Sequence, residues 1–300
     1  MASQRDVRNR IASVKNIQKI TRAMEMVAAA RLRRAEQRIE ALRPYAGAIR
    51  RMTREAAQAA GSVPRLPILV EHDNVGTVGL LLIAGDRGLA GAFNSQIVRA
   101  GVAAGREHDG EGRSPVYLAS GRRPASSLSF RGLEPAQSFV GFSDRPAYAD
   151  ARRIAETLIA AYVDGEVDQV EVFYNGYISP ISQVVRREVL LPLQQATVLE
   201  DSDDDQAEQE ETGQRALVEY EPDPEEILQR LVPDYVEISI YRALLESTAS
   251  EHGARMTAMR NASENAGEII EDLTLEMNRA RQAEITQEIM EVVAGAEGLA

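Results

Sequence analysis

The 300-residue sequence contains no cysteine, which excludes disulfide bridges, thiolate metal sites and a cysteine nucleophile. Its longest apolar run, from Val78 to Ala84, is far shorter than the ~20 residues that cross a bilayer. The N-terminus lacks the apolar core of a secretory signal and enters a helical pattern at once. We therefore expect a cytoplasmic protein that does not span a membrane.

Histidine is scarce, and His72, His108 and His252 stand far apart along the chain. This spacing gives little support to a metal site or to histidine-based catalysis. Carboxylates are abundant, but most fall on predicted solvent-exposed helix faces or in the acidic run from 200 to 211. No nucleophile–base pair stands out. We expect no catalytic residue, no metal and no cofactor, and the sequence does not indicate an enzyme.

Basic charge is concentrated at one end, although the net charge of the chain is −12. Residues 1–54 hold 14 Lys and Arg against 4 Asp and Glu, whereas the other 246 residues have a net charge of −22. Such a basic arm indicates an acidic partner, either nucleic acid or an acidic protein loop. Tyr45 is its only aromatic residue, so the arm offers no stacking platform for bases. We favour an acidic protein loop and expect no nucleic-acid partner.

Both ends of the chain show the 3-4 spacing of apolar residues that is typical of a coiled-coil seam. From Val7 to Ala56 eleven of fifteen seam positions are apolar, and from Leu228 to Ala280 thirteen of sixteen are apolar. The two segments predict a long antiparallel helix pair. If Ala56 lies opposite Leu228, residue 280 lies opposite residue 4, and the last ~15–20 residues protrude beyond the pair.

Individual proline and aspartate residues indicate where these helices begin and where they bend. Pro44 should kink the first helix or end its first part. Asp223 and Pro224 suit the cap and first turn of the second helix, and Pro233 should bend its early turns.

A second apolar stripe runs beside the first seam, at Ile17, Ile20, Met24 and Val27. One helix cannot cover both stripes, because they lie on different faces. The stripe therefore indicates a further partner, or else a three-helix contact within the same chain.

The middle of the chain alternates predicted strands with predicted helices. The strands are Thr77–Ile83, Val116–Ala119, Val170–Tyr174 and Gln183–Leu190, and the helices span 95–104 and 151–162. This order is typical of a small Rossmann-like α/β domain with a mainly parallel sheet. Eight of the twelve residues from 200 to 211 are acidic, which predicts a solvated loop.

The predicted fold class is thus α/β, with a Rossmann-like domain inserted into a long antiparallel two-helix coiled coil. Its parts are an N-terminal helix at 1–58, the α/β domain at 75–195, the acidic loop at 196–222 and a C-terminal helix at 223–300.

A glycine-rich turn, GDRGLAG, places Gly85, Gly88 and Gly91 between a predicted strand and a predicted helix. Dinucleotide folds bind phosphate at this place, but the spacing GxxGxxG is neither their fingerprint nor a P-loop. A tight structural turn is therefore the better interpretation, and a nucleotide-binding enzyme is the weaker one.

Long stretches of the chain resemble the γ subunits of rotary ATP synthases. The resemblance rests on IASVKNIQKITRAMEMVAAARLRRA near the start and on DRGLAGAFN in the middle. It continues with YEPDP, ESTASEHGARMTAMRNASENA and RARQAEITQEIMEVVAGA toward the end. The matching segments come in the right order over nearly the whole chain. The resemblance implies a central rotor shaft that couples ion flow to ATP synthesis without catalysing the reaction itself.

The resemblance also implies partners and contact residues. The helix pair would stand inside a ring of three α and three β subunits, and the α/β domain would lie near the ε subunit and the membrane c-ring. The chain would be peripheral, on the cytoplasmic face of the bacterial cell membrane. Implied contacts with β are Arg22, Met24, Arg31, Arg33, Arg281, Gln282, Thr286 and Glu288, and implied contacts with the c-ring or ε are Tyr220 and Glu221. A coiled-coil adaptor or scaffold protein is the alternative reading of the same helix pair.

Overall fold

The computed structural model describes residues 4–59, 67–72, 74–193 and 224–297. Its elements, in chain order, are α1 (Gln4–Ala59), the 3-10 helix η1 (Pro67–Leu69), β1 (Thr77–Ile83), α2 (Phe93–Gly110), β2 (Ser114–Ser120), α3 (Arg122–Ser129), β3 (Gln137–Phe139), α4 (Tyr148–Val163), β4 (Gln169–Tyr177), β5 (Gln183–Leu191) and α7 (Pro224–Glu297). The chain divides into two compact units, which we call the terminal unit (1–29 with 255–300) and the central unit (30–254). Each long helix contributes to both units.

The sheet of the central unit has the strand order β3-β2-β1-β4-β5. The pairs β1–β2, β1–β4 and β2–β3 are parallel, whereas β5 runs antiparallel to β4. The mainly parallel sheet predicted from the alternation of strands and helices is therefore confirmed. Parallel neighbours need a crossover, and α2 and α4 supply the longest two.

Helices cover both faces of this sheet. Along β1, Leu80 and Leu82 pack into a core with α2 and α3, while Leu81 and Ile83 pack into a second core with α4 and the first turns of α7. Alternate residues of a strand point to opposite faces, which explains the division. Both sets are fully or almost fully buried. A strand buried on two faces reads as a continuous apolar run, as TVGLLLI does.

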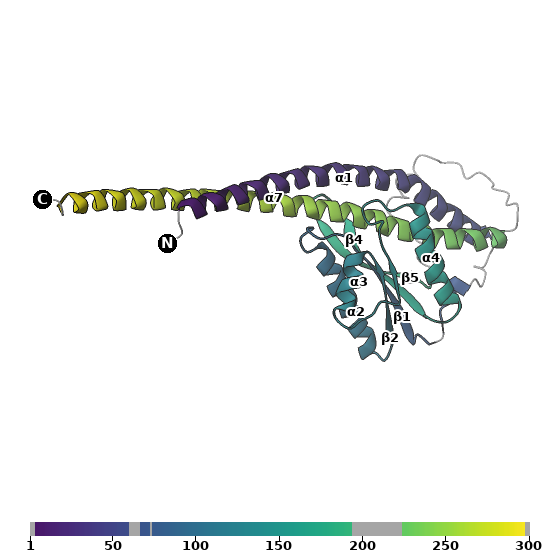
Figure 1. Ribbon diagram of the computed structural model, residues 1–300. Helices are drawn as coiled ribbons and strands as arrows, with labels where there is room; N and C mark the ends of the chain where they lie inside the picture. Colours follow the sequence, from purple (N-terminus) through teal and green to yellow (C-terminus); the bar gives the residue numbers. More distant parts are fainter. Residues whose placement is uncertain (1–3, 60–66, 73, 194–223, 298–300) are drawn as a thin grey trace. The chain divides into compact units, whose positions relative to one another are not determined.

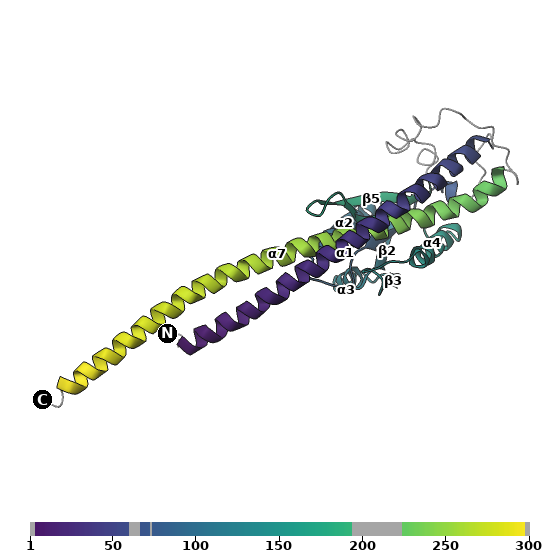
Figure 2. The same cartoon turned by 90° about the horizontal axis from the view of Figure 1, so that it is seen from above.

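In the central unit α1 and α7 run side by side in opposite directions (Figures 1 and 2). Ile49 of α1 packs with Leu231 and Ile238 of α7, and Ala56 and Leu228 share one apolar core. The predicted pairing of Ala56 with Leu228 agrees with these contacts.

Both helices continue through the prolines that were expected to interrupt or bend them. Pro44 lies inside α1 and Pro233 lies inside α7. Glu40, whose carbonyl loses its bond at Pro44, is solvent-exposed, so water can replace that bond. The predicted start of the second helix at Pro224 is confirmed, whereas Asp223 lies outside the described residues.

In the terminal unit the two helices pair with the same antiparallel register. Gln18 Nε2 donates a hydrogen bond to the carbonyl of Ser263 at 3.2 Å, and the side chains of Arg260 and Glu25 form an ion pair at 2.9 Å. Pairing partners therefore have residue numbers that add to about 281–285. The expected pairing of residue 280 with residue 4 falls within this register. Seam residues such as Val7, Ile11, Ala28, Met259 and Ala266 are buried.

Candidate functional site

The second apolar stripe of α1 lies uncovered in the terminal unit. Ile17, Ile20 and Val27 are 51%, 59% and 53% exposed, although they lie next to the buried seam. Arg22 is exposed beside them, and Met24 is half-buried. A three-helix contact formed by the described residues would have buried these side chains, so that alternative is wrong. An apolar stripe left open next to a closed seam is typical of a surface that meets another protein.

A second exposed surface lies at the C-terminal end of α7. Every described side chain from Arg281 to Ala294 is exposed, and α7 runs past the start of α1 in both views (Figures 1 and 2). The predicted protruding segment is therefore confirmed. It carries four of the predicted contact residues, Arg281, Gln282, Thr286 and Glu288.

The predicted contacts do not form one cluster. Given the register, Arg22 and Met24 lie opposite residues near 260, and Arg281 follows about twenty residues later on α7. At 1.5 Å per residue this separation is roughly 30 Å along the helix. Tyr220 and Glu221 lie outside the described residues.

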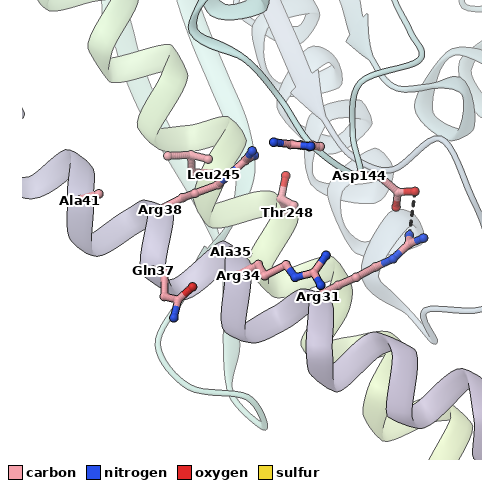
Figure 3. Close-up of a pocket in the computed structure, with 10 residues that line it drawn as sticks. Arg31, Arg34, Ala35, Gln37, Arg38, Ala41, Asp144, Leu245 and Thr248 are labelled. Carbon is pink, nitrogen blue, oxygen red and sulfur yellow. Dashed lines mark hydrogen bonds and ion pairs between the residues drawn. The ribbon is translucent and has the colours of Figure 1, made fainter.

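Two more predicted contacts, Arg31 and Arg33, belong to the central unit. Arg31 forms an ion pair with Asp144 at 2.8 Å (Figure 3). Arg87 binds the same carboxylate oxygen at 3.0 Å. Arg33 is exposed. The structure thus gives Arg31 a partner within the chain, which sequence reasoning had not foreseen.

The glycine-rich turn after β1 is a structural junction. The Asp86 carboxylate accepts hydrogen bonds from the backbone N–H groups of Arg122, Gly141 and Ser143, at 3.0–3.3 Å. A Cβ on Gly85 would lie 2.8 Å from the buried carboxyl group of Glu251 on α7. Gly85 therefore leaves room for a carboxyl group of α7 to pack against the turn, which supports the structural interpretation of GDRGLAG.

Helix α7 is joined to this edge of the sheet by hydroxyl groups that bind backbone carbonyls. The contacts are Ser247 Oγ to Ile83 O at 3.4 Å, Thr248 Oγ1 to Ser143 O at 2.9 Å and Ser250 Oγ to Asn175 O at 3.0 Å. All three hydroxyl residues are buried. Directional bonds of this kind fix the rotation and the height of a helix against a sheet in a way that apolar packing alone does not.

Charged side chains make further contacts between the long helices and the sheet. Arg242 of α7 donates to Glu188 of β5 at 2.9 Å, and the Tyr177 backbone N–H donates to the Glu246 carboxylate at 3.4 Å. Burial raises the pKa of the Glu246 carboxyl above its ordinary value. The Tyr177 hydroxyl donates a hydrogen bond to Glu36 of α1. Both long helices are therefore bonded to the α/β domain within the central unit.

A buried ionic cluster lies in the α/β domain between α2, β4 and β5. Glu171 is 2% exposed and receives two hydrogen bonds from Arg187, at 2.8 and 3.1 Å, while His108 Nε2 lies 3.1 Å from it. Sequence reasoning missed this cluster. The available signal was a glutamate inside the apolar strand QVEVFY, because a buried carboxylate requires a partner.

The described residues contain neither a membrane-spanning helix nor a cluster of metal-binding side chains. No helix among them is long and apolar enough to cross a bilayer. No group of three or more His, Asp or Glu side chains among them could hold a metal ion.

Solved structures of ATP synthases contain chains with the same fold as this one. One chain from a structure of the central stalk and c-ring of the Tetrahymena thermophila mitochondrial ATP synthase is 30% identical, with a TM-score of 0.58, and the match covers 81% of this chain and 99% of that one. A chain of the Euglena gracilis mitochondrial ATP synthase shares the fold at 14% identity, with a TM-score of 0.63 and coverage of 99% and 94%. A long helix pair joined to an α/β domain is thus the fold of a rotary-motor stalk.

Sequence comparisons make the assignment specific. Residues 3–299 match the family described as ATP synthase. The ATP synthase gamma chain of Rubrobacter xylanophilus is 42% identical over 100% of this chain and 99% of its own length. The gamma chain of Moorella thermoacetica is 44% identical over the full length of both. The chain belongs to the ATP synthase gamma chain family, and its role is that of a central-stalk subunit.

Proposed function

We propose that the chain is the rotor shaft that transmits torque between a membrane c-ring and a catalytic ring of α and β subunits. The helix pair acts as the shaft, and the hydroxyl and charged contacts of the central unit hold it to the α/β domain. The subunit does not catalyse the reaction itself. It lies at the cytoplasmic face of the bacterial cell membrane as a peripheral part of the complex.

The observation that carries this proposal is the uncovered stripe of the terminal unit. Ile17, Ile20 and Val27 are each more than half exposed while the seam beside them is closed. A helix pair with one dry seam and one open apolar face is suited to stand inside a collar of other subunits. Contacts that are apolar and weakly polar let the shaft leave each angular position, because they do not hold it as strongly as buried ion pairs would.

The proposed partner contacts follow from this placement. Arg22 and Met24 in the terminal unit, and Arg31 and Arg33 in the central unit, are proposed to meet an acidic loop of β. Arg281, Gln282, Thr286 and Glu288 meet another β loop near the C-terminal end of α7. Tyr220 and Glu221 remain proposed contacts with the c-ring or the ε subunit.

The test is reconstitution of the catalytic ring. The full chain and a chain that lacks residues 281–300 are each mixed with α and β subunits from the same source, and assembly and ATP hydrolysis are measured. We expect one complex whose sustained hydrolysis depends on the full chain, and weaker hydrolysis with the truncated chain. A failure to assemble or to stimulate hydrolysis would favour a coiled-coil adaptor.

A further inference from the structure

The central unit contains a cavity of about 520 Å³ between α1, α7 and the loop that follows β3. Arg31, Arg34 and Arg38 line it from α1 (Figure 3). Arg145 lines it from the loop. Asp144 is the single acidic residue of the lining. The volume falls within the range of pockets that bind small molecules, roughly 300–1,000 Å³.

The three arginines of α1 form a row. Positions 31, 34 and 38 have the i, i+3, i+7 spacing of one helix face, and the row is roughly 10 Å long at 1.5 Å per residue. Figure 3 shows Arg34 and Arg38 reaching to the same side of α1 as Thr248 and Leu245 of α7. Arg145 lines the same space from another element, so an occupant would meet guanidinium groups from two elements.

The positive charge of this row is only partly balanced within the chain. Asp144 is shared by Arg31 and Arg87, and Arg38 makes one long hydrogen bond, of 3.5 Å, to the carbonyl of Pro146. The side chains of Arg34 and Arg145 form no hydrogen bond or ion pair with any residue that the structure describes. Two guanidinium groups that line a cavity without partners there are suited to bind an oxyanion.

We propose that this cavity binds a small anion with at least two linked phosphate groups, either pyrophosphate or a nucleoside diphosphate. Arg34, Arg38 and Arg145 bind the phosphate oxygens. This site goes beyond the proposed shaft function, because the transmission of torque requires no bound ligand. The two proposals can therefore fail independently.

The experiment is a calorimetric titration of the full chain in low salt with pyrophosphate, ADP and orthophosphate in turn. We expect one saturable site for pyrophosphate or ADP, at least about tenfold tighter than for orthophosphate. Equal affinities for pyrophosphate and ADP would identify a site for the phosphate chain alone, whereas tighter binding of ADP would identify a nucleotide site. Orthophosphate binding as tight as that of pyrophosphate would overturn the requirement for linked phosphates.

Matched variants test whether the titrated anion binds in this cavity. We expect R34A and R145A each to weaken binding about tenfold, while R43A, which removes an exposed arginine of α1 outside the cavity, leaves it unchanged. Arg34 and Arg145 are exposed, so their removal should leave thermal unfolding unchanged. Equal losses in R43A and R34A, or no saturable binding to the parent chain, would overturn the site. Binding of a hexaglutamate peptide without binding of pyrophosphate would also overturn it, in favour of an acidic protein loop.

Discussion

The central unit and the terminal unit of the chain are stabilised by different kinds of contact. The central unit buries both faces of a five-stranded sheet and contains a buried ionic cluster. The terminal unit buries a narrow seam, with Val7, Ile11, Ala28, Met259 and Ala266 among its closed positions, and leaves its outer faces open. The central unit therefore holds itself together, whereas the terminal unit depends on partners to cover its apolar surface. Substitutions in the central unit should lower the stability of the free chain. Substitutions in the terminal unit should instead weaken assembly with partner subunits.

The largest loss of stability is expected for E171A. This change leaves Arg187 and His108 without the carboxylate that both contact, and removing one partner of a buried pair costs about 3–5 kcal/mol. Arg187 is partly solvated, with 39% of its side chain exposed, so we expect about 3 kcal/mol in urea unfolding of the full chain. E107A removes the exposed carboxylate that contacts the same arginine and should cost less than ~1 kcal/mol. Equal losses in the free energy of unfolding for E171A and E107A would show that burial of the carboxylate does not determine how much it stabilises the fold.

A smaller loss is expected for D168N, and it should depend on pH. Asp168 accepts hydrogen bonds from His72 and from the backbone N–H groups of Gly76 and Thr77 at 2.8–2.9 Å, and the bond from His72 lowers its pKa below the ordinary value. A lowered pKa means that the carboxylate stabilises the fold at neutral pH and loses this effect as the pH falls through the folded-state pKa.

The measurement for D168N is urea unfolding of the parent and the variant at several pH values. We expect a cost of about 2 kcal/mol near pH 7 that shrinks below pH ~4. A cost that is independent of pH would show that the carboxylate charge is not what stabilises the segment before β1.

A loss of about 1 kcal/mol is expected for S250A at the joint between α7 and the sheet. The serine is fully buried, and its hydroxyl binds the carbonyl of Asn175, which would lose this donor. S263A removes a half-buried serine side chain of α7 in the terminal unit and should change the free energy of unfolding by less than ~0.5 kcal/mol. Urea unfolding of both variants tests the difference between the two units directly.

The smallest effect on the free chain is expected for the double variant I17D/I20D. Both side chains are more than half exposed, so the free energy of unfolding should change by less than ~0.5 kcal/mol. Assembly with α and β subunits should nevertheless fail, because two carboxylates would be buried against the collar. Normal assembly, measured by size-exclusion chromatography, would show that this stripe faces solvent in the complex.

Periodicity was enough to predict the helix pair. A seam repeated over fifteen or sixteen positions outweighs a single proline, which is why α1 and α7 continue through Pro44 and Pro233. The short elements α3 and β3 carry too few residues for a periodic signal, and they were not predicted. Strand β1 was predicted from a different signal, a continuous apolar run that is typical of a strand buried on both faces.

The functional contacts inside the chain depend on residues that are distant in sequence. Asp144 meets Arg31 across 113 positions, and Glu171 meets His108 across 63. No local pattern encodes such pairs, because they form only when the sheet brings separate loops and helices together. The resemblance supplied the proposed partner contacts, whereas the hydrogen bonds of Ser247, Thr248 and Ser250 to the sheet and its loops were found only in the structure.

The antiparallel register has a consequence for how the protein is made. Gln18 and Ser263, which meet in the seam, are 245 positions apart in the chain. At roughly 5–20 residues per second, a ribosome needs about 10–50 seconds to synthesise the segment between them. During this interval the seam of α1 has been made but its partner has not, while most of the sheet can already fold. The topology therefore requires that the apolar seam of α1 stay protected during synthesis until α7 has emerged from the ribosome.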